Sequence, residues 1–361
     1  MNWSDTDASA AARQRLAVIV AGGCSSEWAD AFASVPRHVF VPRLYQQDSH
    51  GAWMPLAWGD AGYLEAVYSD TALTTRLDNR GVPNSYSTQP SLMLAMLEAL
   101  ETGEGHRVLE LGTGTGYDLA LICHRLGDTN VTSVDIDPQL VESASRHLRQ
   151  AGFIPTVVAG HVAEGYPRNA PYDRIISTVG LHMIPRPLLR QAALGAIMVV
   201  PLGYGVVRAI ITGPGHAYGR FLPAPAHFTT WRTTSVAPQL DAALEQPPTD
   251  STIPPSDLLE RLHFPTSVAL PGHTTWAWRD ERGALDAVAL WTPDGSTAIV
   301  HASGSVHQFG PQRLWDTVED LAKLFLDEPA RDDFLLTITP TCQTVTYGDT
   351  EGPAWNLPAV L

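Results

Sequence analysis

The stretch RVLELGTGTGYDLA at residues 107–120 decides the fold. A short apolar run leads into glycines at alternating positions, and a second apolar segment follows them. This order predicts a buried strand at 107–111, a tight turn, and a helix that starts near Tyr117. Such a turn is typical of a site that holds a nucleotide-like ligand, but simple packing of a strand against a helix uses it as well.

The details of the turn narrow the choice of ligand. A phosphate-binding P-loop ends in Gly-Lys-Ser/Thr, and the one lysine of the chain, Lys323, lies far from the turn. The dinucleotide-binding pattern needs a third glycine where this chain has Tyr117. Glu110 precedes the turn, and a carboxylate there repels phosphates and suits a cationic ligand. The sequence therefore disfavours phosphoryl transfer and a pyrophosphate-containing cofactor.

A second acidic residue indicates a ribose. The stretch NVTSVDI at 130–136 is predicted as the next strand, and it brings Asp135 to the end of that strand. An acid at this place accepts hydrogen bonds from both ribose hydroxyls. Asp135 can alternatively cap the following helix, but Asp137 before Pro138 is the better start signal. A ribose, positive charge and no phosphate fit S-adenosyl-L-methionine (SAM), and the combination resembles the cofactor motif of class I methyltransferases.

The chain divides into four regions that differ in their sequence patterns. Residues 85–240 alternate strand and helix patterns, which predicts a doubly wound, mainly parallel sheet of the Rossmann-like α/β class, with SAM bound in this domain. Residues 1–84 are interpreted as an N-terminal helical cap, and the Pro-rich residues 241–257 as a linker. Short strands and one helix follow, so residues 258–361 are predicted to form a C-terminal α+β module that recognises the substrate.

Composition limits the partners and the location of the protein. The net charge of −15 argues against nucleic acid or an anionic membrane as the main partner. The first residues include acids where a signal peptide carries positive charge, and no apolar run approaches the roughly 20 residues that cross a bilayer. Cys24, Cys123 and Cys342 lie far apart, which favours neither a disulfide framework nor a zinc site. We expect a cytoplasmic protein without a metal.

Motifs outside the glycine turn resemble the protein-L-isoaspartate O-methyltransferase family. The segment YSTQP at 86–90 stands where the family carries T-I-S-x-P, and VPRHVFVPRLY at 35–45 is similar to its N-terminal signature. Residues 170–191 and 198–203 are similar to its later motifs, so the match covers roughly residues 30–235 in order. The resemblance implies a class I methyltransferase fold and SAM-dependent carboxyl O-methyltransferase activity.

The resemblance also implies the site residues. Thr88 replaces the catalytic serine of the family, with Ser87 beside it, and both are candidates for a hydroxyl that donates to a substrate carboxylate. The alternative is that they cap the helix that begins near Pro90. The family's Gly-Asp-Gly turn near the adenine is Gly-His-Val here, and His161 either accepts from the adenine amine or faces solvent. The residues expected to bind SAM are Glu110, Gly112, Thr113, Gly114, Gly116, Tyr117, Asp135, Ile136, Gly160, His161, Val162 and Thr178.

Other features resemble one branch of the family, the methyltransferases that accompany ATP-grasp peptide maturases. These features are the polar run before Pro90 and the C-terminal extension. The branch implies methylation of an aspartate side chain in a ribosomally made precursor peptide that an ATP-grasp ligase has crosslinked (a graspetide), with the ester proceeding to an aspartimide. Two alternatives stay open. One is repair of isoaspartyl sites in damaged proteins, and the other is a module that binds SAM or peptide without turnover.

Overall fold

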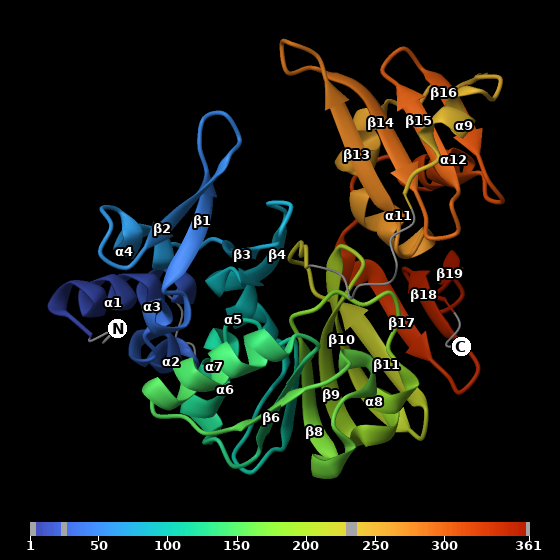
Figure 1. Cartoon of the computed structure of the whole chain (residues 1–361). Helices are drawn as coiled ribbons and strands as arrows, with labels where there is room; N and C mark the ends of the chain where they lie inside the picture. The colour runs from blue at the N-terminus through green and yellow to red at the C-terminus, as the bar shows by residue number, and fades with distance from the viewer. Residues whose placement is uncertain (1–4, 23–26, 229–236, 359–361) are drawn as a thin grey trace. The chain divides into compact units, whose positions relative to one another are not determined.

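The structure, a computed structural model, describes residues 5–22, 27–228 and 237–358 (Figure 1). These residues belong to two compact units. The first unit consists of Met1–Val179, Pro185–Val200 and Ile210–Gly215. The second unit consists of Gly180–Ile184, Pro201–Ala209 and His216–Leu361.

A parallel sheet forms the centre of the first unit. Its strands stand in the order β9-β8-β5-β6-β7. They are β5 (Val108–Leu111), β6 (Val131–Asp135), β7 (Thr156–Ala159), β8 (Tyr172–Ser177) and β9 (Ala192–Leu202). Strand β5 pairs in parallel with β6 on one side and β8 on the other, so the strand order reverses between β5 and β8. The predicted doubly wound, mainly parallel sheet is confirmed.

Two helices beside these strands begin at the helix start signals in the sequence. Helix α6 (Tyr117–Leu126) follows Gly116 directly. Helix α7 (Pro138–Gln150) begins after Asp137, whose side chain accepts a hydrogen bond from the Gln139 N–H, and Pro138 occupies the first helical position as predicted. The other helices of this region are α5 (Pro90–Ala99) and α8 (Arg186–Gln191).

The N-terminal region contains a sheet as well as the expected helices. The helices are α1 (Asp7–Ala21), α2 (Ala29–Ser34), α3 (Arg37–Phe40) and α4 (Tyr63–Val67). A four-stranded sheet in the order β2-β1-β3-β4 joins them, with β1 (Arg43–Gln47), β2 (Trp53–Ala57), β3 (Leu73–Leu77) and β4 (Pro83–Ser87). The sequence did not predict this sheet, because β2 has no fully buried residue and so lacks the apolar alternation of a half-buried strand.

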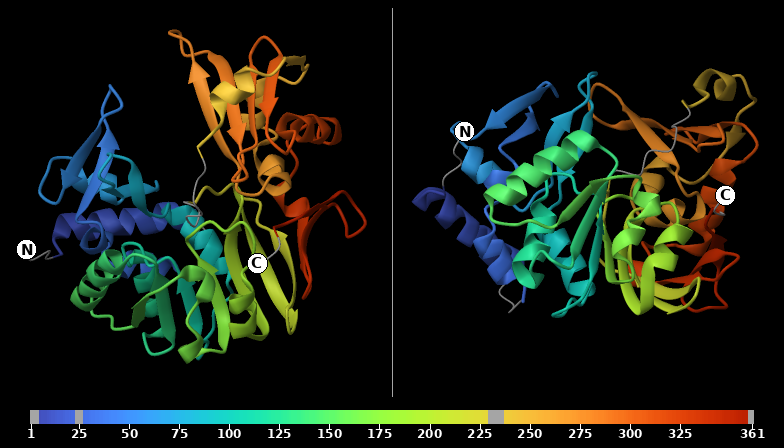
Figure 2. Two further views of the ribbon diagram at one scale, coloured as in Figure 1. Left: turned by 45° about the vertical axis from the view of Figure 1, so that its right-hand side comes forward. Right: turned by 60° about the horizontal axis from the view of Figure 1, so that its bottom comes forward.

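The second unit contains two antiparallel arrays. One has the order β19-β18-β17-β11, with β11 (His216–Phe221), β17 (Phe334–Ile338), β18 (Gln343–Tyr347) and β19 (Ala354–Asn356). The other, whose strands run side by side in both views of Figure 2, has the order β12-β16-β15-β14-β13. Its strands are β12 (Thr249–Asp250), β13 (Thr274–Arg279), β14 (Leu285–Trp291), β15 (Thr297–His301) and β16 (Ser305–Phe309). The helices are α9 (Leu240–Leu244), α10 (Pro255–Leu259), α11 (His263–Ala269) and α12 (Leu314–Leu324). Strand β10 (Gly205–Gly213) is divided between the units at Ala209.

The second unit is not a continuous C-terminal piece. Strand β17 pairs with β11, which precedes the Pro-rich segment in sequence. The Gln343 side chain also holds the backbone of Ile184, accepting from its N–H at 2.9 Å and donating to its carbonyl at 2.6 Å. The segment predicted as a linker, residues 241–257, contains β12 and parts of α9 and α10. Composition cannot show pairings between segments so distant in sequence, and the units therefore differ from the predicted regions.

Candidate functional site

The predicted cofactor residues gather at the carboxyl ends of the parallel strands. Strand β5 runs directly into the glycine turn, and β6 ends at Asp135. The Gly160 N–H, just beyond β7, donates to the Asp135 carbonyl at 2.9 Å, and the Thr178 N–H, just beyond β8, donates to the Leu111 carbonyl at 2.9 Å. Doubly wound sheets bind ligands at this edge, where the strand order reverses.

The glycine turn has a backbone that only glycine tolerates well. Gly112, Gly114 and Gly116 have φ of 95°, 51° and 86°. A Cβ on Gly112 would lie 2.5 Å from Val179 Cγ2 and 2.7 Å from Thr178 Oγ1, and a Cβ on Gly116 would lie 3.1 Å from a side-chain atom of α7. The turn therefore packs tightly against the end of β8 and against α7.

Asp135 fixes the turn and keeps further acceptor capacity. Its side chain is largely buried, with 7% exposed. Oδ2 accepts from the Gly114 N–H at 2.9 Å, and Oδ1 accepts from the Asp137 N–H at 3.0 Å. A carboxylate offers about four lone-pair positions, so these two bonds leave acceptor sites for ribose hydroxyls. Asp137 caps α7, which removes the alternative that Asp135 does so.

Glu110 lies inside the unit rather than open to a ligand. Its side chain is fully buried, and Oε2 accepts from the Ser133 hydroxyl at 2.6 Å. Burial raises the pKa of Glu110 well above its usual range. Its other oxygen, Oε1, is buried without a hydrogen-bond partner among the described residues. The expectation of an exposed anion is therefore corrected, because the carboxyl group stands on a strand that is buried along its whole length.

Three more of the predicted cofactor residues support the turn. The Thr178 hydroxyl donates to the Gly112 carbonyl at 2.7 Å, and the Thr113 hydroxyl lies 2.6 Å from the Ser133 hydroxyl. The Tyr117 ring is 1% exposed and packs near Phe32 and Phe40. Its side chain therefore belongs to the core, and only its backbone remains for a ligand.

The adenine side of the predicted site is formed by the ends of β6 and β7. Ile136 is 57% exposed there, which suits contact with a flat ring. The His161 side chain is exposed, and its Nδ1 accepts from the Ala163 N–H at 3.3 Å at the start of a 3-10 turn. Val162 is buried. The exposure agrees with the interpretation that His161 faces solvent, and the side chain also caps a turn, which the sequence did not predict.

Ser87 and the Thr88 backbone are held by a buried arginine. Arg37 on α3 is fully buried, and its Nε and Nη2 donate to the Ser87 hydroxyl at 3.3 and 3.2 Å. Nη2 also donates to the Thr88 carbonyl at 2.9 Å. Further hydrogen bonds reach the carbonyls of Val67, Ser69 and Thr71. The sequence analysis missed Arg37, although a charge in the apolar stretch VPRHVFV was a signal for it.

The Thr88 hydroxyl faces a carboxyl group. It donates to Asp118 Oδ2 at 3.0 Å. Helix α5 begins at Pro90 with Gln89 as its N-cap and no side-chain capping bond, so neither Ser87 nor Thr88 acts as the cap. The hydroxyl of Thr88 therefore has Asp118 as its partner, and Ser87, which is 2% exposed, is a partner of Arg37. The catalytic role of Thr88 stays a prediction. Asp118 was a second residue that sequence reasoning missed.

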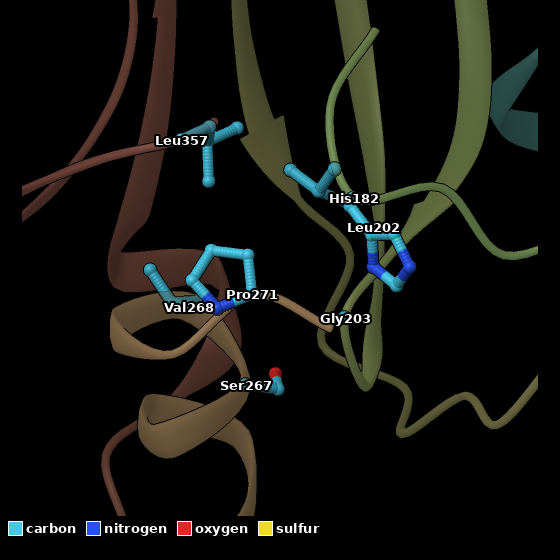
Figure 3. Close-up of a pocket in the computed structure, with 7 residues that line it drawn as sticks. All are labelled: His182, Leu202, Gly203, Ser267, Val268, Pro271 and Leu357. Carbon is cyan, nitrogen blue, oxygen red and sulfur yellow. The ribbon is translucent and has the colours of Figure 1, made fainter. Parts of the chain in front are cut away.

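The second unit contains a pocket of its own (Figure 3). None of the predicted site residues lines it. One wall comes from α11 and the turn after it, and His182 contributes from the segment that follows β8. Burial lowers the pKa of His182. The lining residues are His182, Leu202, Gly203, Ser267, Val268, Pro271 and Leu357.

Within residues 5–22, 27–228 and 237–358, no cluster of three His, Cys, Asp or Glu side chains could hold a metal ion. Cys123 and Cys342 are free thiols, and Cys24 lies outside the described residues. In the same ranges, no helix is long and apolar enough to cross a membrane.

The parallel sheet, the left-handed glycine turn and the acid at the end of the second strand define a class I SAM-dependent methyltransferase. The residues fit SAM, because Asp135 keeps acceptor sites for a ribose, Ile136 is exposed beside it, and the turn contains no lysine that would hold a phosphate. The family model described as protein-L-isoaspartate(D-aspartate) O-methyltransferase (PCMT) matches residues 19–211, and the chain belongs to this family. Membership confirms the predicted carboxyl O-methyltransferase activity and SAM as the cofactor.

Curated relatives agree with the family assignment. The protein-L-isoaspartate O-methyltransferase of Ignicoccus hospitalis is 35% identical over 204 residues, which cover 55% of this chain and 85% of the relative. Enzyme 1 of Archaeoglobus fulgidus is 36% identical over 176 residues, or 48% of this chain and 70% of the relative. A solved protein-L-isoaspartate O-methyltransferase has the same fold with a TM-score of 0.57 at 20% identity, covering 93% of this chain and 100% of the other. The C-terminal extension therefore does not distinguish the peptide-maturation branch.

Replacing Asp135 by alanine should weaken SAM binding roughly tenfold to a hundredfold. The loss of hydrogen bonds to a charged acceptor costs about 1.5–3 kcal/mol. Asp137→Ala is the matched control, because it removes a neighbouring carboxylate that caps α7, so we expect lower stability with nearly unchanged affinity. Calorimetric titration with SAM measures both variants. Wild-type affinity in Asp135→Ala would remove Asp135 from the site.

Proposed function

We propose that this protein transfers the methyl group of SAM to a side-chain carboxylate of a peptide or protein, with an L-isoaspartyl residue as the first candidate substrate. The observation that carries the proposal is the placement of Thr88. Its hydroxyl is not used to cap α5, and the preceding residues approach the glycine turn, where a Cβ on Gly114 would lie 3.6 Å from the Tyr86 carbonyl oxygen. A hydroxyl beside the SAM turn is suited to orient a methyl acceptor.

The methyl transfer depends on alignment of the carboxylate with the methyl group more than on proton transfer. A carboxylic acid with a pKa near 4 is ionised at neutral pH, so the acceptor is already a nucleophile and needs no general base. SAM, when bound, supplies an electrophilic methyl group. Thr88 can hold one carboxylate oxygen by a hydrogen bond and leave the other oxygen aimed at the methyl carbon. Holding the reactants in line can account for much of the rate enhancement.

A second candidate substrate is an aspartate side chain in a precursor peptide that an ATP-grasp ligase has crosslinked. The polar run before Gln89–Pro90 supports it. Thr88 in place of serine and His161 in the turn near the adenine are departures that favour the non-catalytic binding module instead. In this function, attack of a neighbouring backbone amide nitrogen on the methyl ester would expel methanol and give an aspartimide. The C-terminal extension no longer supports this candidate over repair.

Methyl transfer from labelled SAM separates the candidates. An L-isoaspartyl peptide, its normal aspartyl counterpart and an aspartyl peptide crosslinked by an ATP-grasp ligase are compared at equal concentration. Preference for the isoaspartyl peptide supports repair, and preference for the crosslinked precursor supports peptide maturation. Binding of SAM with no methylation of any of them would leave the non-catalytic binding module and contradict the proposal.

Thr88→Val should lower kcat roughly tenfold to a hundredfold while SAM affinity stays close to that of the wild type. The reason is that valine is nearly isosteric and lacks only the hydroxyl, and a hydrogen bond to a charged group is worth about 1.5–3 kcal/mol. Thr88→Ser is the matched control, since it keeps the hydroxyl, and it should retain most of the activity. Initial rates with the preferred peptide and calorimetry with SAM are measured. Undiminished kcat in Thr88→Val would exclude a catalytic role for this hydroxyl.

A further inference from the structure

Asp118 is a carboxyl group that has no role in the methyl transfer proposed above. It lies in the first turn of α6, directly after the glycine turn. Oδ2 accepts the Thr88 hydroxyl proton at 3.0 Å, whereas Oδ1 is buried with no hydrogen-bond partner among the described residues. An ionised carboxylate with one oxygen buried and unpaired is costly, so the environment does not favour the anion.

The ionised form of Asp118 also conflicts with the role of Thr88. A hydroxyl group has one proton. If Thr88 donates that proton to an Asp118 carboxylate, it has none for the substrate. A substrate carboxylate beside Thr88 would also stand close to a second negative charge, and two carboxylates that share a site keep one proton between them.

Resting on the proposed function, we propose that Asp118 is a positioning residue that carries a proton while the substrate carboxylate is bound. The protonated Asp118 donates to Thr88 Oγ1, and this bond turns the Thr88 hydroxyl proton toward one oxygen of the substrate. The other oxygen then forms the new bond to the methyl carbon as the carbon–sulfur bond breaks and its electron pair stays on sulfur. Asp118 and Thr88 each keep their proton through the transfer.

The charges around Asp118 are consistent with this arrangement. The groups that face it are Arg37 on α3, Glu110 on β5 and Tyr117 on its own helix. Arg37 favours the anion, but the hydrogen bonds of Arg37 in the described chain go to Ser87 and to backbone carbonyls. Burial raises the pKa of Asp118 to about 6, against the lowering effects of Thr88 and Arg37. A bound substrate anion would raise it further.

The kinetic test compares wild type, Asp118→Asn and the control Glu142→Gln, which changes an exposed acid on α7. The asparagine side chain carries an N–H donor at every pH and so imitates protonated Asp118. We expect wild-type kcat/KM on an L-isoaspartyl peptide to fall as pH rises through the pKa of Asp118, because the active form is the protonated one. Each pH unit above a pKa removes the protonated form about tenfold. The Asp118→Asn variant should not show this fall, and its kcat/KM should exceed that of the wild type roughly a hundredfold at pH 8, two units above a pKa of about 6. The Glu142→Gln variant should show the same fall as the wild type.

Thr88→Val provides an internal check. If Asp118 acts through Thr88, adding Asp118→Asn to Thr88→Val should not change kcat/KM further. A residue with a merely structural role would shift rates at all pH values without removing the fall. Asp118→Asn that keeps the wild-type pH profile, or loses activity throughout while it binds SAM normally, would overturn the proposal.

A second measurement does not depend on any substrate. Carboxyl carbon resonances of protein labelled with ¹³C-aspartate are titrated, and the Asp118 signal is assigned by its loss in Asp118→Asn. The expected midpoint lies well above the ordinary value of about 3.9, and Thr88→Val should raise it further because a bond that favours the anion is lost. An ordinary midpoint would contradict the role of Asp118. If wild type methylates no peptide, the proposed function fails, and the titration still decides the state of Asp118.

Discussion

Gly112→Ala is expected to remove measurable SAM binding and to lower the free energy of unfolding. The backbone at Gly112 has a φ of 95°, which costs a non-glycine residue roughly 1–3 kcal/mol. The added methyl group would also lie 2.5 Å from Val179 Cγ2 and 2.7 Å from Thr178 Oγ1, an overlap that typically costs about 1–3 kcal/mol more. Relief of either conflict must move the end of β8 or the turn, and the turn is where we expect SAM to bind.

Gly114→Ala is the matched control for this change. Gly114 also has a positive φ, 51°, but a Cβ there would meet only the Tyr86 carbonyl oxygen at 3.6 Å, an ordinary contact. We therefore expect a loss of about 1 kcal/mol from the backbone alone. Calorimetry with SAM and urea unfolding measure both variants. If both variants lose the same SAM affinity and the same free energy of unfolding, the close packing of Gly112 against the end of β8 is not important.

Arg37→Met is expected to lower the free energy of unfolding by roughly 3–5 kcal/mol. Methionine fills much of the space but donates no hydrogen bond. The substitution would leave the Ser87 hydroxyl and the carbonyls of Val67, Ser69, Thr71 and Thr88 without their donor. Each buried polar group left unpaired costs about 1–3 kcal/mol, and relaxation recovers part of the sum. Because Thr88 is one of these groups, methyl transfer should also fall.

Arg146→Met tests whether the effect belongs to the burial of Arg37. Arg146 is an exposed residue of α7 whose guanidinium bonds Ser143, so its loss should change stability by less than about 0.5 kcal/mol. Urea unfolding, read by circular dichroism, gives both values. A loss under about 1 kcal/mol in Arg37→Met would mean that water or a rearrangement replaces the guanidinium easily.

The part of the fold around the glycine turn could be predicted because local signals agree there. The apolar run at 107–111, the turn and the start of α6 follow one another without a gap, and Asp137 with Pro138 marks the start of α7. Doubly wound sheets bind ligands at strand ends and glycine turns, so the sequence also predicts the SAM site at this edge, and its residues stay a prediction.

The rest depends on contacts between distant segments. Arg37 lies 50 residues from Ser87, whose hydroxyl it bonds, and Asp118 lies 30 residues from Thr88. No periodic pattern in the sequence identifies either residue as part of the site. The pairing of β11 with β17 likewise joins segments on both sides of the Pro-rich stretch. Such contacts are set by tertiary packing, which a single sequence shows only where a family resemblance supplies it.

The central claim is that a side-chain carboxylate accepts the methyl group of SAM. Protein incubated with labelled SAM and an L-isoaspartyl or crosslinked aspartyl peptide is analysed by mass spectrometry before and after mild alkali. A methyl ester on the peptide is predicted, gained only with SAM, released as methanol by alkali, and strongly reduced in Thr88→Val. A methyl group that withstands alkali, or one that Thr88→Val transfers as fast as the wild type, would contradict the account.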